Sequence, residues 1–369
     1  MKALKTIHVH GAPSEYILQK GALELLESKL VERNLRKVLV VHGVKSWAAA
    51  KDYWPNLKEI ETEEYTYSGE CSLDEIEKVS NLVTAHNDEA IIGVGGGKVL
   101  DLVKAAGNKT NKPVILIPTL ASNCSPWTPI SVLYDSFGTF KGFEIYPVST
   151  SLLLIEPEIL VHAPIDLFIA GIGDTLAKWY EGDVQLKTID HKTVPMMISH
   201  YAAKECKDIL LQSSAAAVHA IENGKLNEDF IKVVETIIVY AGMVGGFGDH
   251  FGRTAGAHSI HNGLTVLDET HHALHGAKVA YGILVQLVLE NRWDEIKALI
   301  PFYQQLGLPL SLKELGIEEL TDKAVQQVAE KATLPQESIH VIPIGEITPA
   351  KVSDAMVELE QFSTQLSLH

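Results

Sequence analysis

Histidines gather in one short stretch of the C-terminal half. Of the 16 histidines, six lie between positions 250 and 275: His250, His258, His261, His271, His272 and His275. Histidine is the commonest metal ligand in proteins, and side chains three or four positions apart share a helix face. The spacing therefore predicts one helical pair, His258 with His261, and a second, His271 with His275. The cluster predicts a metal site, and the alternative is a set of partly exposed histidines with ordinary hydrogen bonds.

A metal site of this kind needs a further ligand, and Asp174 is the candidate. It follows Gly171 and Gly173 at the expected start of a helix that continues to Glu181. One carboxylate and two histidines would leave an open coordination position, as catalytic metal sites require. The alternative is that Asp174 only caps the helix.

A glycine-rich turn indicates a second kind of chemistry. The apolar run 91–94 predicts a buried strand, Gly95, Gly96 and Gly97 follow it, and residues 98–106 have helical spacing. A strand, a glycine turn and a helix direct free backbone N–H groups at a phosphate. Lys98 adds a positive charge at the turn. The alternative is a tight turn without a ligand, because such a motif alone is weak evidence.

The elements that must position these residues differ between the two parts of the chain. Up to about residue 150, apolar strands alternate with amphipathic helices: strands at 37–41, 90–94 and 113–118, and helices at 74–86 and 99–107, with a last strand at 152–157 that ends at a proline. Such alternation predicts βαβ units, a parallel sheet and ligands at the carboxyl ends of the strands.

Long helical segments dominate after Asp166: 171–185, 195–223, 227–243, 277–291 and 350–364. We therefore predict an α/β nucleotide-binding domain at 1–160 and an all-helical domain at 161–369. The segment 300–345 cannot be assigned from its pattern.

Composition excludes several classes of function. The 369 residues are 46% hydrophobic and carry a net charge of −16, which argues against a nucleic-acid partner. No uninterrupted apolar run of membrane-spanning length is visible, the N-terminus lacks a signal peptide's apolar core, and three scattered cysteines fit a reducing cytoplasm. An anionic substrate would need a local positive centre.

Six segments together resemble the iron-containing alcohol dehydrogenase superfamily, and within it the glycerol dehydrogenase branch: Gly95–Asp101, Pro118–Ser122, Ser131–Tyr134, Gly171–Asp174, His258–Leu264 and His275–Gly282. They span most of the chain in order. The resemblance implies an active site in the cleft between the two domains, with Asp174, His258 and His275 as metal ligands. It also implies a homo-oligomer.

The same resemblance implies the nucleotide-binding residues. Gly95, Gly96, Gly97, Lys98 and Asp101 would lie at the pyrophosphate, and Thr119, Ser122, Thr128, Ile130 and Tyr134 along the rest of the dinucleotide.

Two departures from the family pattern concern the metal and the substrate. Iron-dependent members carry a histidine where this chain has Lys178, so zinc is the predicted metal, with iron, nickel and manganese as alternatives. Glycerol dehydrogenases have an aspartate where this chain has Cys124. Losing that carboxylate removes an acceptor for a polyol and a charge that repels a carboxylate. The segment 123–127 is similar to a hydroxycarboxylate dehydrogenase branch that reduces 2-oxo acids, and Trp127 would form an apolar wall.

A third departure concerns the cofactor. NAD-selective relatives have an aspartate at the position of Gly43, where a carboxylate accepts from the ribose 2′-OH and repels a 2′-phosphate. Gly43 does neither, and Lys45 is near in sequence. We therefore predict that the chain accepts NADP(H), with NAD(H) as the alternative.

These features predict a metal-dependent dehydrogenase that interconverts a small alcohol or 2-hydroxy acid and its carbonyl. His261 and His271 are candidates for relaying the proton, Phe247 and Cys124 for lining the substrate pocket, and Lys104 and Lys278 are expected to be structural or solvent-facing. The alternative substrate is glycerol. A dehydroquinate-synthase-like lyase is disfavoured by the few arginines, and a nucleotide-binding protein without catalysis would not need the Asp-His-His set.

Overall fold

The apolar runs of the N-terminal part form a six-stranded, fully parallel sheet in the computed structural model, which describes residues 7–318 and 321–366. The strand order is β1-β8-β5-β4-β2-β3. The strands are β1 (Tyr16–Leu18), β2 (Lys37–His42), β3 (Glu61–Thr66), β4 (Ala90–Gly95), β5 (Val114–Pro118) and β8 (Leu152–Ile155). The central strands β4, β5 and β8 are buried throughout, as their unbroken apolar sequences predict.

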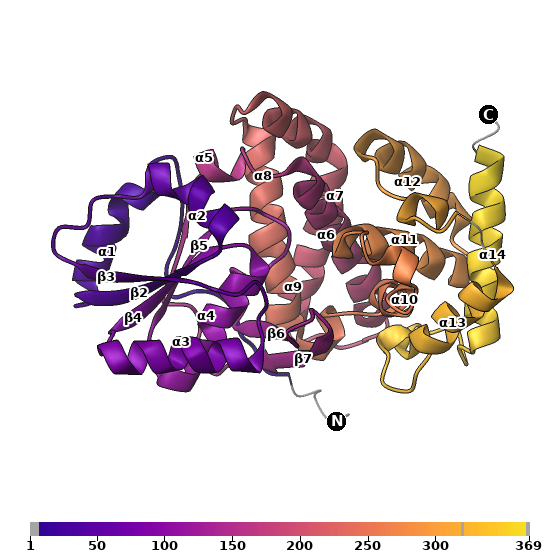
Figure 1. Cartoon of the computed structure of the whole chain (residues 1–369). Helices are drawn as coiled ribbons and strands as arrows, with labels where there is room; N and C mark the ends of the chain where they lie inside the picture. Colours follow the sequence, from indigo (N-terminus) through magenta and orange to yellow (C-terminus); the bar gives the residue numbers. More distant parts are fainter. Residues whose placement is uncertain (1–6, 319–320, 367–369) are drawn as a thin grey trace. The chain divides into compact units, whose positions relative to one another are not determined.

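Helices cover both faces of this sheet, with α1 and α2 on one side and α3 and α4 on the other (Figure 1). Their bounds are α1 (Leu26–Glu32), α2 (Val44–Ala50), α3 (Leu73–His86), α4 (Gly97–Thr110) and α5 (Pro157–Leu160). Ser72 caps α3, because its side chain accepts from the N–H of Glu75. A separate antiparallel hairpin, β6 (Ile130–Tyr134) and β7 (Phe140–Ile145), follows the loop after β5.

The C-terminal part is helical: α6 (Ile165–Leu186), α7 (Val194–Asn223), α8 (Glu228–Glu235), α9 (Ala241–Gly248), α10 (Gly256–Leu264), α11 (His275–Leu289), α12 (Trp293–Leu306), α13 (Asp322–Ala332) and α14 (Pro349–Leu366). A π-helical turn at Thr236–Tyr240 joins α8 to α9. Helix α10 packs against α11 and α13, and α14 packs against α11 and α13 (Figure 1). The predicted fold class, a parallel α/β part followed by an all-helical part, is confirmed.

Two compact units divide the chain. The helical unit comprises Met1–Val9, Asp166–His219 and Glu235–His369, and the α/β unit comprises His10–Ile165 and Ala220–Val234. The run Glu228–Gly252 is long and apolar enough to cross a membrane by length and composition. However, 56% of its most apolar window is buried within the protein, as is usual for a core helix.

Two local predictions are wrong. Asp174 does not begin a helix, because α6 starts at Ile165 and Asp174 lies in its interior. His271 and His275 do not share a helix face, because α11 begins at His275 and His271 lies in the preceding turn. Asp174 is therefore not a helix cap, and its buried carboxylate needs another explanation.

Candidate metal centre and nucleotide turn

Three side chains of the helical unit converge. Asp174, His258 and His275 each offer a ligand atom, and these atoms all lie within 4.8 Å of one another. The Oδ1 atom of Asp174 is 3.2 Å from Nε2 of His258 and 3.6 Å from Nε2 of His275. Although α6, α10 and α11 are separate in sequence, they bring the carboxylate and the two imidazoles to one point.

Glycines permit this convergence. A Cβ atom on Gly276 would lie 1.7 Å from the carbonyl oxygen of Ala170, and one on Gly173 would lie 2.6 Å from that of Gly276. Helices α6 and α11 therefore approach each other closely only without side chains at these positions. Asp174 directly follows Gly173, and His275 directly precedes Gly276, so the contact places the two ligand candidates together.

A buried carboxylate orients His258. Nδ1 of His258 lies 2.6 Å from Oε2 of Glu181, while Oε1 of Glu181 accepts from the backbone N–H groups of Ala255 and His258. Gln286 accepts from the N–H groups of Gly256 and Ala257. These side chains satisfy donors at the start of α10. Because Glu181 holds Nδ1–H, the Nε2 atom of His258 faces Asp174.

The electrostatics of the cluster favour an ionised Asp174. Burial alone would raise the pKa of its carboxyl, but the Lys178 ammonium, 3.8 Å away, and the contacts with His258 and His275 hold the pKa well below its usual range. Burial opposes the charged form of His258, yet the carboxylates of Glu181 and Asp174 raise its pKa to about 9. The Lys178 ammonium and a proton on His258 together offset the charges of the two carboxylates.

His261 lies behind His275, and His271 does not join the cluster. Nδ1 of His275 is 2.9 Å from Nε2 of His261. Burial, together with the neighbouring His275 and His258, lowers the pKa of His261 well below its usual range. His271 is exposed, and its ring contacts the carbonyl oxygen of Thr265 instead.

The cluster fits a divalent metal ion. Asp174 is buried, and its Oδ1 atom makes no hydrogen bond among the residues that the structure describes, although the rings of His258 and His275 and the Lys178 ammonium lie 3.2 to 3.8 Å away. A buried, ionised carboxylate is costly unless cations pair with it, and a metal ion held by Oδ1 and the two Nε2 atoms would do so. One carboxylate oxygen and two imidazole nitrogens suit zinc and other first-row metals.

In the α/β unit, the glycine turn lies between β4 and α4. Gly95 has φ +152°, and a Cβ atom there would lie 2.5 Å from Cγ1 of Val99. A Cβ atom on Gly97, the first residue of α4, would lie 2.8 Å from Nδ2 of Asn123. Glycine at these two positions therefore lets the turn pack closely against Val99 and Asn123. The N–H groups at the start of α4 are of the kind that bind an anion. The ammonium of Lys98 pairs with Glu70 at 2.5 Å.

Asp101 has protein partners that account for its carboxylate. Oδ1 of Asp101 accepts from the hydroxyl of Ser125 and pairs with Lys104 at 2.9 Å, and Oδ2 accepts from the N–H of Val132. Lys104 also donates to the carbonyl oxygens of Thr128 and Ile130. This buried pair anchors the loop before β6, which fits the structural role predicted for Lys104. The place of Asp101 at a pyrophosphate stays a prediction.

The remaining predicted residues have varied surroundings. In the α/β unit, Thr119 and Thr128 are buried, while Gly43, Gly96, Ser122, Cys124, Ile130 and Tyr134 are partly exposed. In the helical unit, Phe247 on α9 is partly exposed. Trp127 is buried, donates to the carbonyl of Gly11 and packs on Tyr16, and its role as a wall of the substrate pocket stays a prediction.

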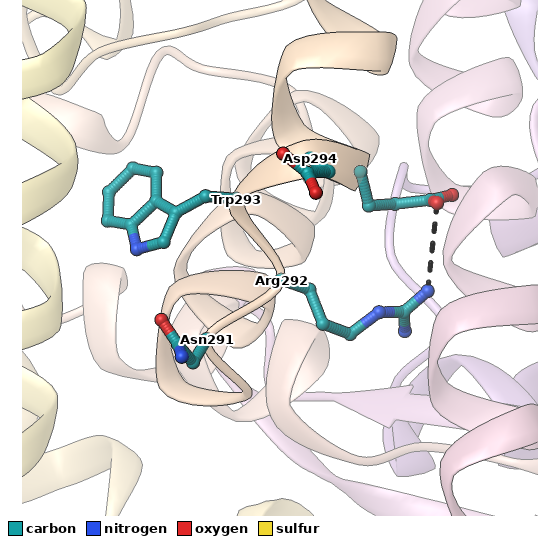
Figure 2. A pocket seen from close by; sticks show the side chains of 5 residues that line it. Asn291, Arg292, Trp293 and Asp294 are labelled. Atoms are coloured by element: carbon teal, nitrogen blue, oxygen red, sulfur yellow. Dashed lines mark ion pairs between the residues drawn. The ribbon is translucent and has the colours of Figure 1, made fainter.

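A cavity elsewhere in the helical unit contains none of the predicted residues. It has a volume of about 490 Å³ and is lined by Asn291, Arg292, Trp293, Asp294 and Glu295 (Figure 2). Arg292 is paired with Glu295 at 3.8 Å, as the dashed line in Figure 2 shows, and with Glu290 at 3.6 Å. This open recess has no metal-ligating set, so the Asp174 cluster remains the candidate centre.

Sequence reasoning missed the residues behind the ligand candidates. Glu181 follows Asp174 by seven positions, so their shared helix face was a readable signal. Asn262, which follows His261, and Glu337, in the unassigned segment 300–345, have no such signal, because the contact between them joins positions 75 apart.

The chain is similar to known proteins over nearly its whole length. Residues 13–157 match the sequence family of iron-containing alcohol dehydrogenases. The chain is 36% identical to hydroxycarboxylate dehydrogenase A of Escherichia coli, over 96% of this chain and 98% of that protein. It is 34% identical to a glycerol dehydrogenase of Thermotoga maritima, over 90% and 91%. The crystal structure of a probable glycerol dehydrogenase from Sinorhizobium meliloti superposes with a TM-score of 0.86 at 30% identity, over 97% and 100%.

Proposed function

Because the chain belongs to the iron-containing alcohol dehydrogenase family and is an oxidoreductase acting on a CH–OH group, we propose that it interconverts a small 2-hydroxy acid and its 2-oxo acid with NADP(H). The observation that carries the proposal is the convergence of Asp174, His258 and His275. Similarity to a hydroxycarboxylate dehydrogenase over 96% of the chain supports the substrate class.

Asp174, His258 and His275 would hold one divalent metal ion, with zinc as the first candidate. When bound, such an ion supplies Lewis-acid polarisation of a substrate oxygen. The chain's own contribution is orientation. Glu181 holds the Nδ1–H group of His258, and His261 contacts Nδ1 of His275, so that both Nε2 atoms face Asp174.

The glycine turn at the start of α4 would receive the pyrophosphate of the dinucleotide. Beyond β2, Gly43 presents no carboxylate to the adenosine ribose, and a Cβ atom there would lie 3.1 Å from the Tyr67 ring. Lys45 is exposed on the first turn of α2. The absence of a repelling carboxylate and the nearby ammonium support NADP(H) over NAD(H).

The test is a panel of 2-oxo acids, aldehydes and polyols, with both cofactors and with zinc, manganese or iron. We expect the highest kcat/KM for a 2-oxo acid with NADPH, and loss of metal and activity in Asp174→Ala. A tenfold preference for NADH would overturn the cofactor assignment. Full activity of metal-stripped Asp174→Ala would overturn the site.

Glycerol is the second candidate substrate, because several similar proteins are glycerol dehydrogenases. Cys124 stands where a carboxylate would accept hydrogen bonds from a triol. Replacing it, Cys124→Asp, should lower kcat/KM for 2-oxo acids and raise it for glycerol. A wild-type enzyme that already prefers glycerol would exclude the 2-oxo acid proposal.

A further inference from the structure

We propose that Asn262 and Glu337 are positioning residues for the metal-ligand candidate His275: through His261, they determine which ring nitrogen of His275 carries the hydrogen. The inference rests on the proposed metal site and extends it to residues with no contact to the metal.

An unbroken chain of hydrogen bonds leads away from His275. Its Nδ1 atom lies 2.9 Å from Nε2 of His261, and Nδ1 of His261 lies 3.1 Å from Oδ1 of Asn262. The amide nitrogen of Asn262 donates to Oε2 of Glu337 at 3.0 Å. Four side chains therefore form one line that begins at the metal cluster.

Glu337 fixes the direction of every bond in this line. A carboxylate only accepts, so the NH2 group of Asn262 must face Glu337, and the amide oxygen must face His261. His261 must then carry its hydrogen on Nδ1 and accept at Nε2. His275 consequently carries its hydrogen on Nδ1, which leaves the Nε2 lone pair on the side of Asp174, 3.6 Å away.

Without Glu337, the amide of Asn262 could rotate and present its NH2 group to His261. His261 would then have to carry its hydrogen on Nε2, where it would oppose the Nδ1–H group of His275. The cluster would lose the only arrangement in which His275 can offer Nε2 to a metal and still donate from Nδ1.

Hydrogen bonds attach the backbone around Glu337 to α10. The hydroxyl of Ser338 donates to the carbonyl of Ala255, and the N–H of Ile339 donates to the hydroxyl of Ser259. Helix α10, which carries His258 and His261, thus also holds the loop that carries Glu337. This anchoring keeps the carboxylate in register with Asn262.

The line is suited to orientation rather than to proton delivery. Asn262 has no titratable group, so it cannot pass a proton between His261 and Glu337. If His261 relays a proton, as predicted, that proton does not travel through Asn262.

The test measures metal affinity and geometry rather than turnover. Zinc affinity of the whole 369-residue chain is determined by competition with a chelating dye, and the absorption spectrum of the cobalt-loaded protein reports coordination. The variants are Asn262→Leu, Glu337→Ala and Glu337→Gln. The matched control is Glu330→Ala, which removes an exposed carboxylate that accepts from the amide of Gln326 and has no link to a histidine.

We expect zinc affinity to fall about tenfold in Asn262→Leu and about threefold in Glu337→Ala, with an altered cobalt spectrum, because partners behind metal ligands typically account for 10–100-fold. Glu337→Gln keeps an acceptor oxygen and should restore most of the affinity, and Glu330→Ala should match the wild type.

Two outcomes overturn the inference in different ways. If Asp174→Ala loses zinc while both Glu337 variants bind like the wild type, the metal site stands and the positioning role fails. If Asp174→Ala and the wild type bind zinc equally, the proposed site itself fails, and this inference fails with it. Should Asn262→Leu not fold, the Glu337 pair decides alone.

Discussion

The two histidines that face Asp174 differ in their exposure and in the group that contacts their Nδ1 atom. The side chain of His258 is 15% exposed, and the carboxylate behind it, Glu181, is fully buried. The side chain of His275 is 55% exposed, and the group behind it is the neutral ring of His261. A hydrogen bond to a carboxylate is stronger than one between neutral groups. We therefore expect the His258 side of the cluster to be rigid and the His275 side to depend on helix packing and on a longer line of partners.

We expect the largest effect from a substitution at Gly276, where α11 contacts α6 beside His275. Gly276→Ala places a Cβ atom 1.7 Å from the carbonyl oxygen of Ala170, so α6 and α11 must separate. We expect the free energy of unfolding to fall by about 3 kcal/mol and metal binding to be lost. Denaturant titration and metal analysis measure both. In the control Gly182→Ala, on α6, the new methyl group meets Ala203 only at 3.6 Å, so the fold should be retained. Equal stability of the two variants would contradict the packing argument.

Removing the charge behind His258 should have the next largest effect. In Glu181→Gln, an amide NH2 group replaces the carboxylate oxygen that faces Nδ1 of His258, and His258 must move its hydrogen to Nε2, toward Asp174. We expect zinc affinity to fall about 100-fold, measured by chelator competition. The control Glu295→Gln alters a carboxylate that accepts from Tyr180 and has no histidine partner, and its affinity should equal that of the wild type. An unchanged affinity in Glu181→Gln would remove the reason for treating the two histidines differently.

The group behind His275 should matter less. His261→Phe keeps a ring but removes the acceptor of the His275 Nδ1–H group, and we expect zinc affinity to fall about tenfold. The control His271→Phe should leave affinity unchanged, because His271 contacts only the neighbouring turn. If His261→Phe lowers kcat while zinc affinity stays constant, His261 delivers protons rather than orienting His275.

Much of the fold could be predicted from the sequence because its core strands are continuous apolar runs. Strands β2, β4, β5 and β8 were predictable for this reason, whereas β3 was not, since its residues 61–66 are mostly charged or polar and lie at the sheet edge. The three-residue β1 is too short to show a pattern.

The sequence predicted the proposed ligands, but it did not predict the carboxylates of Glu181 and Glu337 that lie behind them. Asp174, His258 and His275 belong to segments with family resemblance, and the structure brings these three side chains together. Glu181 could have been found from its spacing on α6. Glu337 could not, because its role depends on how a loop docks on α10, and no local pattern in the sequence encodes that docking.

Asp88 contrasts with Glu181, because its fully buried carboxylate makes no hydrogen bonds among the described residues and has only a long ion pair with His86, at 3.9 Å. Burial raises its pKa, with Glu63 adding to the effect and His86 opposing it. Glu181, whose carboxylate takes part in three hydrogen bonds with Ala255 and His258, has a pKa that His258 lowers despite its burial.

Asp88→Asn should therefore stabilise the protein. A carboxyl with a raised pKa binds its proton more tightly in the folded state. The free energy of unfolding of the wild type therefore falls as the pH rises from the ordinary pKa of 3.8 through the raised value. We expect the variant to gain about 1 kcal/mol in the free energy of unfolding at pH 8, and the gain to shrink as the pH falls. Chemical denaturation at several pH values measures it. A gain that does not vary with pH would mean that the charge of Asp88 is not its cause, and a loss of stability at pH 8 would show that this carboxylate is paired in solution as Glu181 is in the structure.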